Sequence, residues 1–268
     1  MKLRGVIMLV LGVGLGLVLA MALAGCQVEE QPLAISGLEV APVEHHFVEA
    51  DCPAERCAEV TVEALHFPDA PALSDDLRHR LLTLGQGFSE KPVQAQASDS
   101  WEAYAEAFFQ QARAEREFSP AHGASQAVLQ ASVVERHDAL LIIELNSYVY
   151  HAGQAHGLPM TAYMVIDERL GQAVTLEEML LEGQEPAFQA ALFRAHEQWL
   201  QEQEADSYFV GFWPPVESRN VAPLAAAWAV TYNVYEIAPY AFGQPTLHIP
   251  LSELEGIARP RYLSSSQP

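Results

Sequence analysis

LLIIELNSYVYHAGQAHGLPMTAYMVID, residues 140–167, contains two strand-like segments joined by a short loop that is rich in glycine and histidine. In Leu140–Tyr150 four aliphatic residues lead into an alternation of polar and apolar side chains, and Met160–Asp167 is again rich in β-formers. Upstream, Ala127–Glu135 alternates in the same way and reaches Leu140 through the turn Arg136-His137-Asp138. We therefore expect an antiparallel hairpin followed by a third strand.

The residues before this region predict two further strands and two helices. Gly37–Glu49 and Glu59–Phe67 have strand patterns, and Leu73–Leu84 and Asp99–Glu117 have helical spacing. The second helix carries one apolar stripe, which we expect to lie in the core: Trp101, Tyr104, Ala105, Phe108 and Ala112.

The residues after it continue the mixture of helices and strands. Thr175–Leu181 reads as a short helix with a capping box between Thr175 and Glu178, and Gln184–Gln203 reads as a longer helix. The remaining expected elements are the rigid loop Trp213-Pro214-Pro215, the strands Ala227–Tyr235 and Thr246–Pro250, and a closing helical turn, Leu251–Ile257. The sequence thus predicts an α+β fold of antiparallel sheets with packed helices, in two intimately associated subdomains, 37–124 and 125–260, followed by a polar tail, 261–268.

The first residues have the layout of a bacterial secretory signal. Lys2 and Arg4 precede an apolar run, Val6–Leu23, and Leu23-Ala24-Gly25-Cys26 resembles a lipobox. We expect a signal peptide over residues 1–25, a lipid on Cys26 that anchors the chain to a membrane, and a tether over residues 26–36. Gln27 after the cysteine favours the outer membrane, with the protein facing the periplasm or the exterior.

The composition is strongly acidic. Residues 1–25 contain two of the 14 basic residues and none of the 35 acidic ones, so the 243 residues from Cys26 onward carry a formal charge of −23. This charge disfavours nucleic acid and anionic lipid as partners and favours a cationic partner, or it is simply a solvated acidic surface.

Cys52 and Cys57 are the two cysteines that remain if Cys26 is lipidated. In an oxidising compartment they are expected to form a disulfide across the turn-like Pro-Ala-Glu-Arg segment. A zinc site is disfavoured, since no second Cys/His pair lies nearby.

Two passages resemble the RsiV-like ectodomain family. The first, residues 140–175, contains YHAGQAHG (150–157) where that family has a YxxGGAHG loop, followed by a strand, a turn and a short helix; the second is TYNVYEIAPYAFGQPTLHIPLSEL, within residues 228–254. The resemblance covers most of residues 37–257. It implies the fold, and it suggests a ligand, because the best-known members are anti-sigma factors whose ectodomains bind lysozyme, while other members accompany peptidoglycan deacetylase domains.

This sequence departs from those members in two respects. No cytoplasmic segment precedes the signal, so we do not expect anti-sigma activity. Gln154 stands where a second glycine is usual, which alters the backbone freedom of the loop.

The sequence contains no motif that specifies catalysis or a cofactor. The spacing of His151 and His156, even with Asp167 as a third ligand, matches no known metal motif, and hydrogen bonding within the loop or contact with a partner are the alternative roles of these histidines. No G-x-S-x-G elbow is present, and Glu236 is a lone acid without a partner. We therefore predict no enzymatic activity, no catalytic residues, no metal and no cofactor.

The predicted function is binding of a cationic protein, such as lysozyme or a related muramidase, at the cell envelope. Tyr148, Tyr150, Trp213, Tyr235, Tyr240 and Phe242 are aromatic residues that can serve either as interface anchors or as core. The predicted binding residues are Tyr150, His151, Gly153, His156, Gly157, Trp213 and Tyr240. The alternatives are a protein that binds or modifies peptidoglycan, and a structural envelope protein without a discrete ligand.

Replacing Cys26 by Ser is expected to abolish acylation and to leave an uncleaved precursor in the inner membrane. Metabolic lipid labelling and membrane fractionation measure both effects. A Cys26→Ser variant that is still trimmed and that still fractionates with the outer membrane contradicts the lipoprotein prediction.

Overall fold

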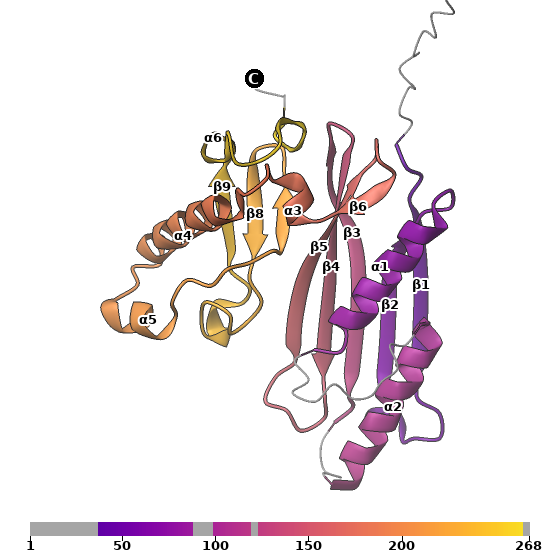
Figure 1. Cartoon of the computed structure of the whole chain (residues 1–268). Helices are drawn as coiled ribbons and strands as arrows, with labels where there is room; N and C mark the ends of the chain where they lie inside the picture. The colour runs from indigo at the N-terminus through magenta and orange to yellow at the C-terminus, as the bar shows by residue number, and fades with distance from the viewer. Residues whose placement is uncertain (1–36, 88–98, 119–122, 265–268) are drawn as a thin grey trace, which may run out of the picture. The chain divides into compact units, whose positions relative to one another are not determined.

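The protein is a mixed α+β structure with a six-stranded and a three-stranded sheet (Figure 1). The computed structural model describes residues 37–87, 99–118 and 123–264. The six-stranded sheet has the order β1 (Ala41–Val48), β2 (Glu59–His66), β3 (Gln126–His137), β4 (Leu140–Tyr150), β5 (Leu158–Asp167) and β6 (Gln172–Val174). Neighbouring strands are antiparallel except β2 and β3, whose parallel connection contains helices α1 (Pro71–Leu84) and α2 (Trp101–Phe118).

The second layer is built from the rest of the chain. Its sheet has the order β7 (Val221–Pro223), β8 (Ala227–Thr231) and β9 (Thr246–Pro250), all antiparallel. Its other elements are the helices α3 (Leu176–Met179), α4 (Glu185–Glu202), α5 (Ser207–Phe212) and α6 (Leu251–Leu254), and the 3₁₀ turns η2 (Tyr240–Phe242) and η3 (Pro260–Tyr262). A further 3₁₀ turn, η1 (Ala54–Arg56), lies between β1 and β2 of the first sheet.

Two hydrophobic cores lie on opposite faces of the six-stranded sheet, and β4 contributes to both. Leu141, Ile143 and Leu145 belong to the core beneath α1 and α2, which cover one face of the sheet in Figure 1. Leu140 and Ile142 belong to the core shared with α4 and with the three-stranded sheet. Successive side chains of a strand point to opposite faces, so the aliphatic run at the start of β4 holds both layers.

Most of the predicted elements are present. The expected stripe of α2 is buried from Trp101 to Ala112, and Thr175 and Glu178 form the capping box of α3. The expected strand over residues 227–235 ends earlier, at Thr231. Tyr232 still donates its N–H to Pro245, but proline has no N–H to donate in return, and the chain turns at Asn233. The sequence analysis did not predict β6, α5 or β7.

The two predicted subdomains meet inside one sheet. The expected boundary at residues 124/125 falls just before β3, which pairs with β2, and residues 35–268 form one compact unit. Tyr262, which the sequence analysis placed in the tail, is fully buried, and its carbonyl accepts a hydrogen bond from Trp228 at 3.2 Å.

The hydrogen-bonding groups at the outer edge of β5 are satisfied by the short strand β6 at one end and by side chains in the middle. Over residues 165–167 this edge pairs with β6, and Pro159 lacks an N–H to expose. Between them, Thr161 donates its N–H to Oδ1 of Asn233 at 2.7 Å. Tyr163 donates its N–H to Oδ1 of Asn220 at 2.9 Å, and Nδ2 of Asn220 donates to the carbonyl of Thr161 at 2.9 Å. Two asparagine side chains therefore make the hydrogen bonds that a neighbouring strand would make here.

Asn220 also joins the two layers directly. Its Nδ2 donates to the carbonyl of Thr231, at the end of β8, at 2.8 Å, and its own carbonyl accepts the N–H of Thr231 at 3.3 Å. The three-stranded sheet is thus fixed to the edge of the six-stranded one by hydrogen bonds as well as by the shared core.

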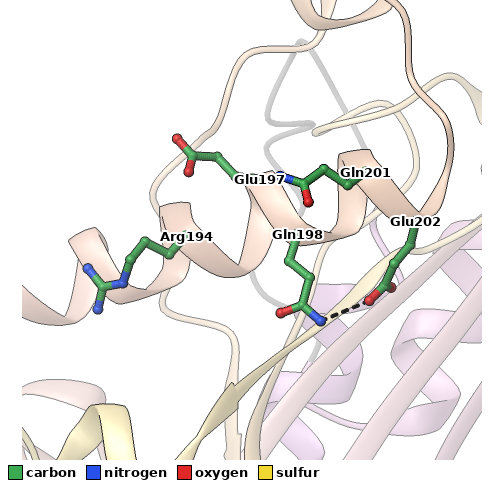
Figure 2. Close-up of a pocket in the computed structure, with 5 residues that line it drawn as sticks. All are labelled: Arg194, Glu197, Gln198, Gln201 and Glu202. Atoms are coloured by element: carbon green, nitrogen blue, oxygen red, sulfur yellow. Dashed lines mark hydrogen bonds between the residues drawn. The ribbon is translucent and has the colours of Figure 1, made fainter.

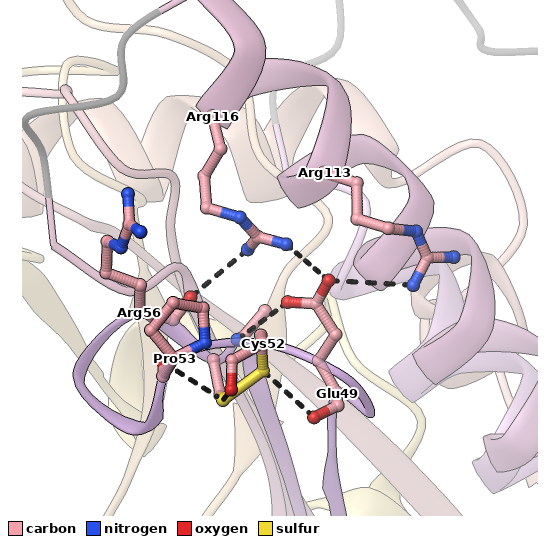
Figure 3. The surroundings of a disulfide bond; sticks show 8 residues. Glu49, Cys52, Pro53, Arg56, Arg113 and Arg116 are labelled. Carbon is pink, nitrogen blue, oxygen red and sulfur yellow. Dashed lines mark hydrogen bonds and ion pairs between the residues drawn. A yellow bond between two sulfur atoms is a disulfide. The ribbon is translucent and has the colours of Figure 1, made fainter.

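A disulfide joins Cys52 and Cys57, as the sequence analysis predicted, with 5.3 Å between the Cα atoms (Figure 3). It closes the loop between β1 and β2, and a loop this short contributes about 2 kcal/mol by restricting the unfolded chain.

Beside the disulfide, Glu49 is buried with its charge compensated (Figure 3). Arg116 of α2 donates to its carboxylate, the N–H of Ala58 donates at 3.1 Å, and Arg113 lies 3.6 Å away. Burial alone raises the pKa of Glu49, but the hydrogen bonds from Arg116 and Ala58 and the two positive charges outweigh it and hold the pKa below its usual value. This ion pair ties the end of α2 to the sheet.

The predicted signal peptide, Cys26 and the tether lie outside the described residues. Within the part of the chain that the structure does describe, no helix has the length and apolar character needed to cross a membrane.

We expect Arg116→Met to lower the free energy of unfolding at pH 7 by about 2–4 kcal/mol, because it leaves the Glu49 carboxylate buried without its main partner. A depressed pKa stabilises the fold above the unfolded pKa, and this stability is lost as pH falls through the folded value. The difference between wild type and variant in urea titrations should therefore narrow between pH 7 and pH 3.

Arg113→Met is the matched control for this experiment. The Arg113 side chain is 44% exposed and the Arg116 side chain 16%, so the control should lose less than about 1 kcal/mol. Equal losses for the two variants would contradict the assignment of Arg116 as the main partner of Glu49.

We expect Asn220→Ala to lower the free energy of unfolding by about 2–3 kcal/mol, because it leaves the N–H of Tyr163 and two carbonyls of the two sheets without partners. Asn146→Ala is the control, since Asn146 bonds only the side chains of Glu144 and Thr161. Urea titration measures both. A loss for Asn220→Ala no larger than that for Asn146→Ala would show that the edge of β5 does not depend on this side chain.

Candidate functional site

The loop between β4 and β5, residues 151–157, is held in shape by hydrogen bonds within it and to its surroundings. The side chain of Gln154 accepts the N–H of His151 at 3.2 Å, and Gln154 donates its own N–H to the carbonyl of His151 at 3.0 Å. Gly153 has a φ of 99°, a conformation open to glycine. Gln154 therefore stabilises the turn that Gly153 permits.

His151 attaches this loop to α2. Its Nδ1 lies 3.1 Å from the carboxylate of Glu115, and its ring packs against Phe108 with 5.3 Å between the centroids. Tyr150, the preceding residue, is half-buried and pairs with Gln126 in the sheet. Of these two predicted binding residues, His151 therefore contacts α2, whereas Tyr150 alternates with the buried Val149 and lies on the opposite face of the sheet, on the same side as Tyr148.

His156 faces the opposite side and forms an aromatic group with two tyrosines. Its ring stacks on Tyr240 with 3.7 Å between the centroids, and its Nε2 lies 3.1 Å from the hydroxyl of Tyr235. The Tyr240 hydroxyl donates to the carbonyl of Gly157 at 3.0 Å. Tyr235 has a φ of 70° at the turn that follows Asn233, and this strained conformation presents its ring to solvent.

Gly157 is required by close packing. A Cβ at this position would lie 2.2 Å from the ring of Tyr148, which packs against the backbone. Glycine therefore lets the ring of Tyr148 lie flat against the end of the loop beside His156.

A second aromatic group surrounds α5. Trp199 of α4, Phe209 of α5 and Phe242 of η2 contact one another, with ring centroids 5.2–6.3 Å apart. Tyr208 and Phe212 pack together at 4.7 Å on the outside. Asp206 caps α5 by accepting the N–H of Phe209 at 2.8 Å.

Trp213 follows α5 and is half-buried, and its N–H donates to the carbonyl of Phe209 at 3.0 Å. The segment after it is held by two side chains of the second layer: Tyr232 donates its hydroxyl to Val216, and Gln189 donates to Ser218 at 3.2 Å. The Trp213-Pro214-Pro215 loop is therefore fixed at both ends.

The turn η2 joins these two groups, since Tyr240 belongs to the first and Phe242 to the second. We call the combined region the aromatic surface; it comprises Tyr148, His156, Tyr235, Tyr240, Phe242, Trp199, Tyr208, Phe209, Phe212 and Trp213. Several of its rings are open to solvent: Tyr208 is 74% exposed, Phe212 65%, Tyr235 47% and Phe242 42%.

The structure brings together some of the predicted binding residues and separates others. His156, Gly157 and Tyr240 are in direct contact, whereas Trp213 is linked to Phe209 of α5 through its backbone N–H. His151 contacts α2, and Tyr150 lies at the end of β4 on the face of the sheet opposite to α2. The sequence analysis missed α5. The sequence feature that indicates α5 is Asp206, a favourable N-cap residue, directly before the aromatic segment SYFVGF.

The acidic residues that the sequence analysis considered as a metal ligand or a lone acid make contacts within the fold. Among the described residues, no group of three or more His, Cys, Asp or Glu side chains is arranged to hold a metal ion. Asp167 pairs with Arg261, away from both loop histidines, and Glu236 accepts the N–H of Asn233 at 2.7 Å. Asp167 and Glu236 therefore have structural roles.

Two surface depressions of the described chain are polar and open. One lies on the outer face of α4, where Arg194, Glu197 and Gln201 point outward separately and Gln198 bonds Glu202 at 2.9 Å (Figure 2). The other runs along the edge of β5, beside Asn220 and Asn233. Neither of them gathers polar groups around a common point.

Comparison with known proteins identifies a family without an assigned function. The model of DUF3298, a protein family of unknown function, matches residues 177–252. No curated protein matches the sequence.

Two solved structures share the fold. A DUF3298 family member from Bacteroides fragilis is 19% identical, with a TM-score of 0.62 over 83% of this chain and 94% of that one. A DUF3298 family protein from Pseudomonas aeruginosa is 31% identical, with a TM-score of 0.73 over 85% of this chain and 97% of that one. Identity at this level over nearly the whole relative shows that the chain belongs to the DUF3298 family.

Proposed function

We propose that this protein is a non-enzymatic binding module of the bacterial cell envelope and that it binds a cationic protein through the aromatic surface. The observation that carries the proposal is the exposure of Tyr208, Phe212, Tyr235 and Phe242 on neighbouring segments, in which Phe209 of α5 contacts Phe242 of η2 and Tyr235 contacts Tyr240 of η2. Aromatic side chains of this kind supply most of the binding energy in protein interfaces.

The aromatic surface is rigid, which favours binding. Asp206 caps α5, Tyr240 is fixed by its bond to Gly157, and Tyr232 holds the segment after Trp213. A ligand that binds to fixed rings loses little conformational freedom of the receptor, so more of the contact energy appears as affinity.

Acidic residues border these rings and favour a positively charged ligand. Glu202, Glu204 and Asp206 precede α5, Glu217 follows Trp213, and all four are exposed. Lysozyme or a related muramidase is the candidate, because the resemblance to the RsiV-like ectodomains implies it and because such enzymes are basic. The envelope location rests on the lipobox-like sequence ending at Cys26.

Binding of chicken lysozyme to the folded chain at 0.15 M salt tests the proposal. We expect Phe212→Ala, Trp213→Ala and His156→Ala each to weaken binding by about fivefold or more, because each removes an anchor of 1 kcal/mol or more. Leu170→Ala, in the exposed turn after β5 and distant in sequence from these rings, is the control and should leave affinity unchanged.

A basic protein of similar size and unrelated fold, such as cytochrome c, separates recognition from charge. It should bind weakly, lose binding as salt rises, and respond to none of the four variants. Equal affinity for lysozyme and cytochrome c, or no lysozyme binding at moderate salt, would refute the proposal. Binding of peptidoglycan fragments that the same variants abolish would instead assign this surface to a glycan ligand.

A further inference from the structure

Half of one face of the six-stranded sheet is covered by nothing in the described chain. α1 and α2 pack on the opposite face, and the second layer covers this one over Leu140 and Ile142 of β4 and over β5 and β6, where Val165 and Val174 belong to its core. The uncovered half, which we call the open face, consists of alternate residues of four strands: Glu44 and His46; Glu59, Thr61 and Glu63; Gln126, Val128 and Gln130; Glu144, Asn146 and Tyr148.

The register aligns the polar side chains of the open face in one row. Glu44 lies directly opposite Glu63, Glu63 is paired with Gln130, and Gln130 with Asn146. Gln130 donates to Glu63 at 2.6 Å and Asn146 donates to Glu144 at 2.7 Å. With strands about 4.8 Å apart, the row is about 14 Å wide.

Among the described residues, no lysine or arginine compensates the negative charge of the open face. Like charges directly opposite each other on paired strands are destabilising, yet Glu44 and Glu63 are so placed, and among the described residues Glu44 makes no hydrogen bond or ion pair. Of the basic side chains that the structure describes, His46 is the one that approaches a carboxylate on this face, at 3.4 Å from Glu59.

Elsewhere on the described chain, basic residues meet acidic ones. Arginines pair with carboxylates on the helices, on the β3 hairpin and in the second layer, for example Arg78 with Asp75, Arg136 with Glu168, Arg194 with Glu253 and Arg261 with Asp167. The open face is therefore a place where the excess negative charge of the chain stays available to a partner.

The open face also adjoins the aromatic surface. Tyr148 follows Asn146 on the same face of β4, and its ring packs against Gly157, the residue after His156. A ligand that contacts the aromatic rings at Tyr148 therefore also lies close to the row of polar and acidic side chains on the open face.

We propose that the open face binds the positively charged surface of the protein ligand, with Glu44 and Glu63 as the principal contacts. This proposal rests on the proposed function, and it specifies the separate contributions of the open face and the aromatic surface to binding. The open face attracts the ligand over distance and sets the association rate, while the aromatic surface, which is desolvated on contact, sets the dissociation rate.

The test is the association rate of lysozyme with Glu44→Gln/Glu63→Gln, compared with Glu102→Gln/Glu106→Gln. Both double variants remove two negative charges, but Glu102 and Glu106 lie on α2, on the opposite side of the sheet. At about 20 mM salt we expect the open-face variant to associate about threefold to tenfold more slowly, and the α2 variant less than twofold more slowly. Equal slowing by the two variants would overturn the proposal.

A second probe keeps this result separate from the proposed function. If wild type does not bind lysozyme, an octalysine peptide followed by amide chemical shifts still tests the open face. We expect shifts to concentrate at the amides of β1 and β2 and to vanish in Glu44→Gln/Glu63→Gln. Shifts spread evenly over all acidic surfaces, or binding of a neutral chito-oligosaccharide to β1 and β2 without a response to octalysine, would refute a cationic ligand at this face.

Discussion

The structure depends on how the outer edge of β5 is satisfied. A strand edge inside a folded chain leaves N–H and C=O groups that must find partners, and here Asn220 and Asn233 supply them at Thr161 and Tyr163. Both asparagines belong to the second layer, so the same bonds that close the edge attach that layer. Because these edge groups are already bonded, a ligand cannot extend the sheet by pairing with β5 at Thr161 and Tyr163.

The attachment of Asn233 to the edge of β5 also determines the position of the aromatic surface. Asn233 begins the turn that presents Tyr235, and Glu236 fixes that turn by accepting the N–H of Asn233. The turn leads into η2, whose Tyr240 stacks on His156 and whose Phe242 packs against Phe209. The rings from the β4–β5 loop and from α5 are therefore brought together by one short segment, which is itself fixed to the sheet edge.

Periodicity predicted the first layer well, because its strands and helices bury one face each. Alternation marked β2 and β3, and helical spacing marked the buried stripe of α2. Leu140–Tyr150 was predicted with its observed bounds. The sequence did not indicate that its first four aliphatic residues contribute to two cores, because a segment that is buried on both faces shows no alternation of polar and apolar residues.

The candidate site was harder to predict, because it is assembled by contacts between distant segments. His156 and Tyr240 are 84 residues apart, and their stacking follows from the bonds of Asn233 and not from any local pattern. β6, α5 and β7 span six residues or fewer, too short for a periodic signal. The cysteine pair was predicted correctly because composition alone restricted the choice to Cys52 and Cys57.

Hydrogen exchange of the Thr161 and Tyr163 amides tests the central claim most directly. If the asparagine side chains replace a strand, both amides exchange slowly, at rates like those of β4 amides within the sheet, and Asn220→Ala speeds exchange at Tyr163 more than at Thr161, which keeps its bond to Asn233. Exchange of both wild-type amides at the rate of an exposed strand edge would contradict the account.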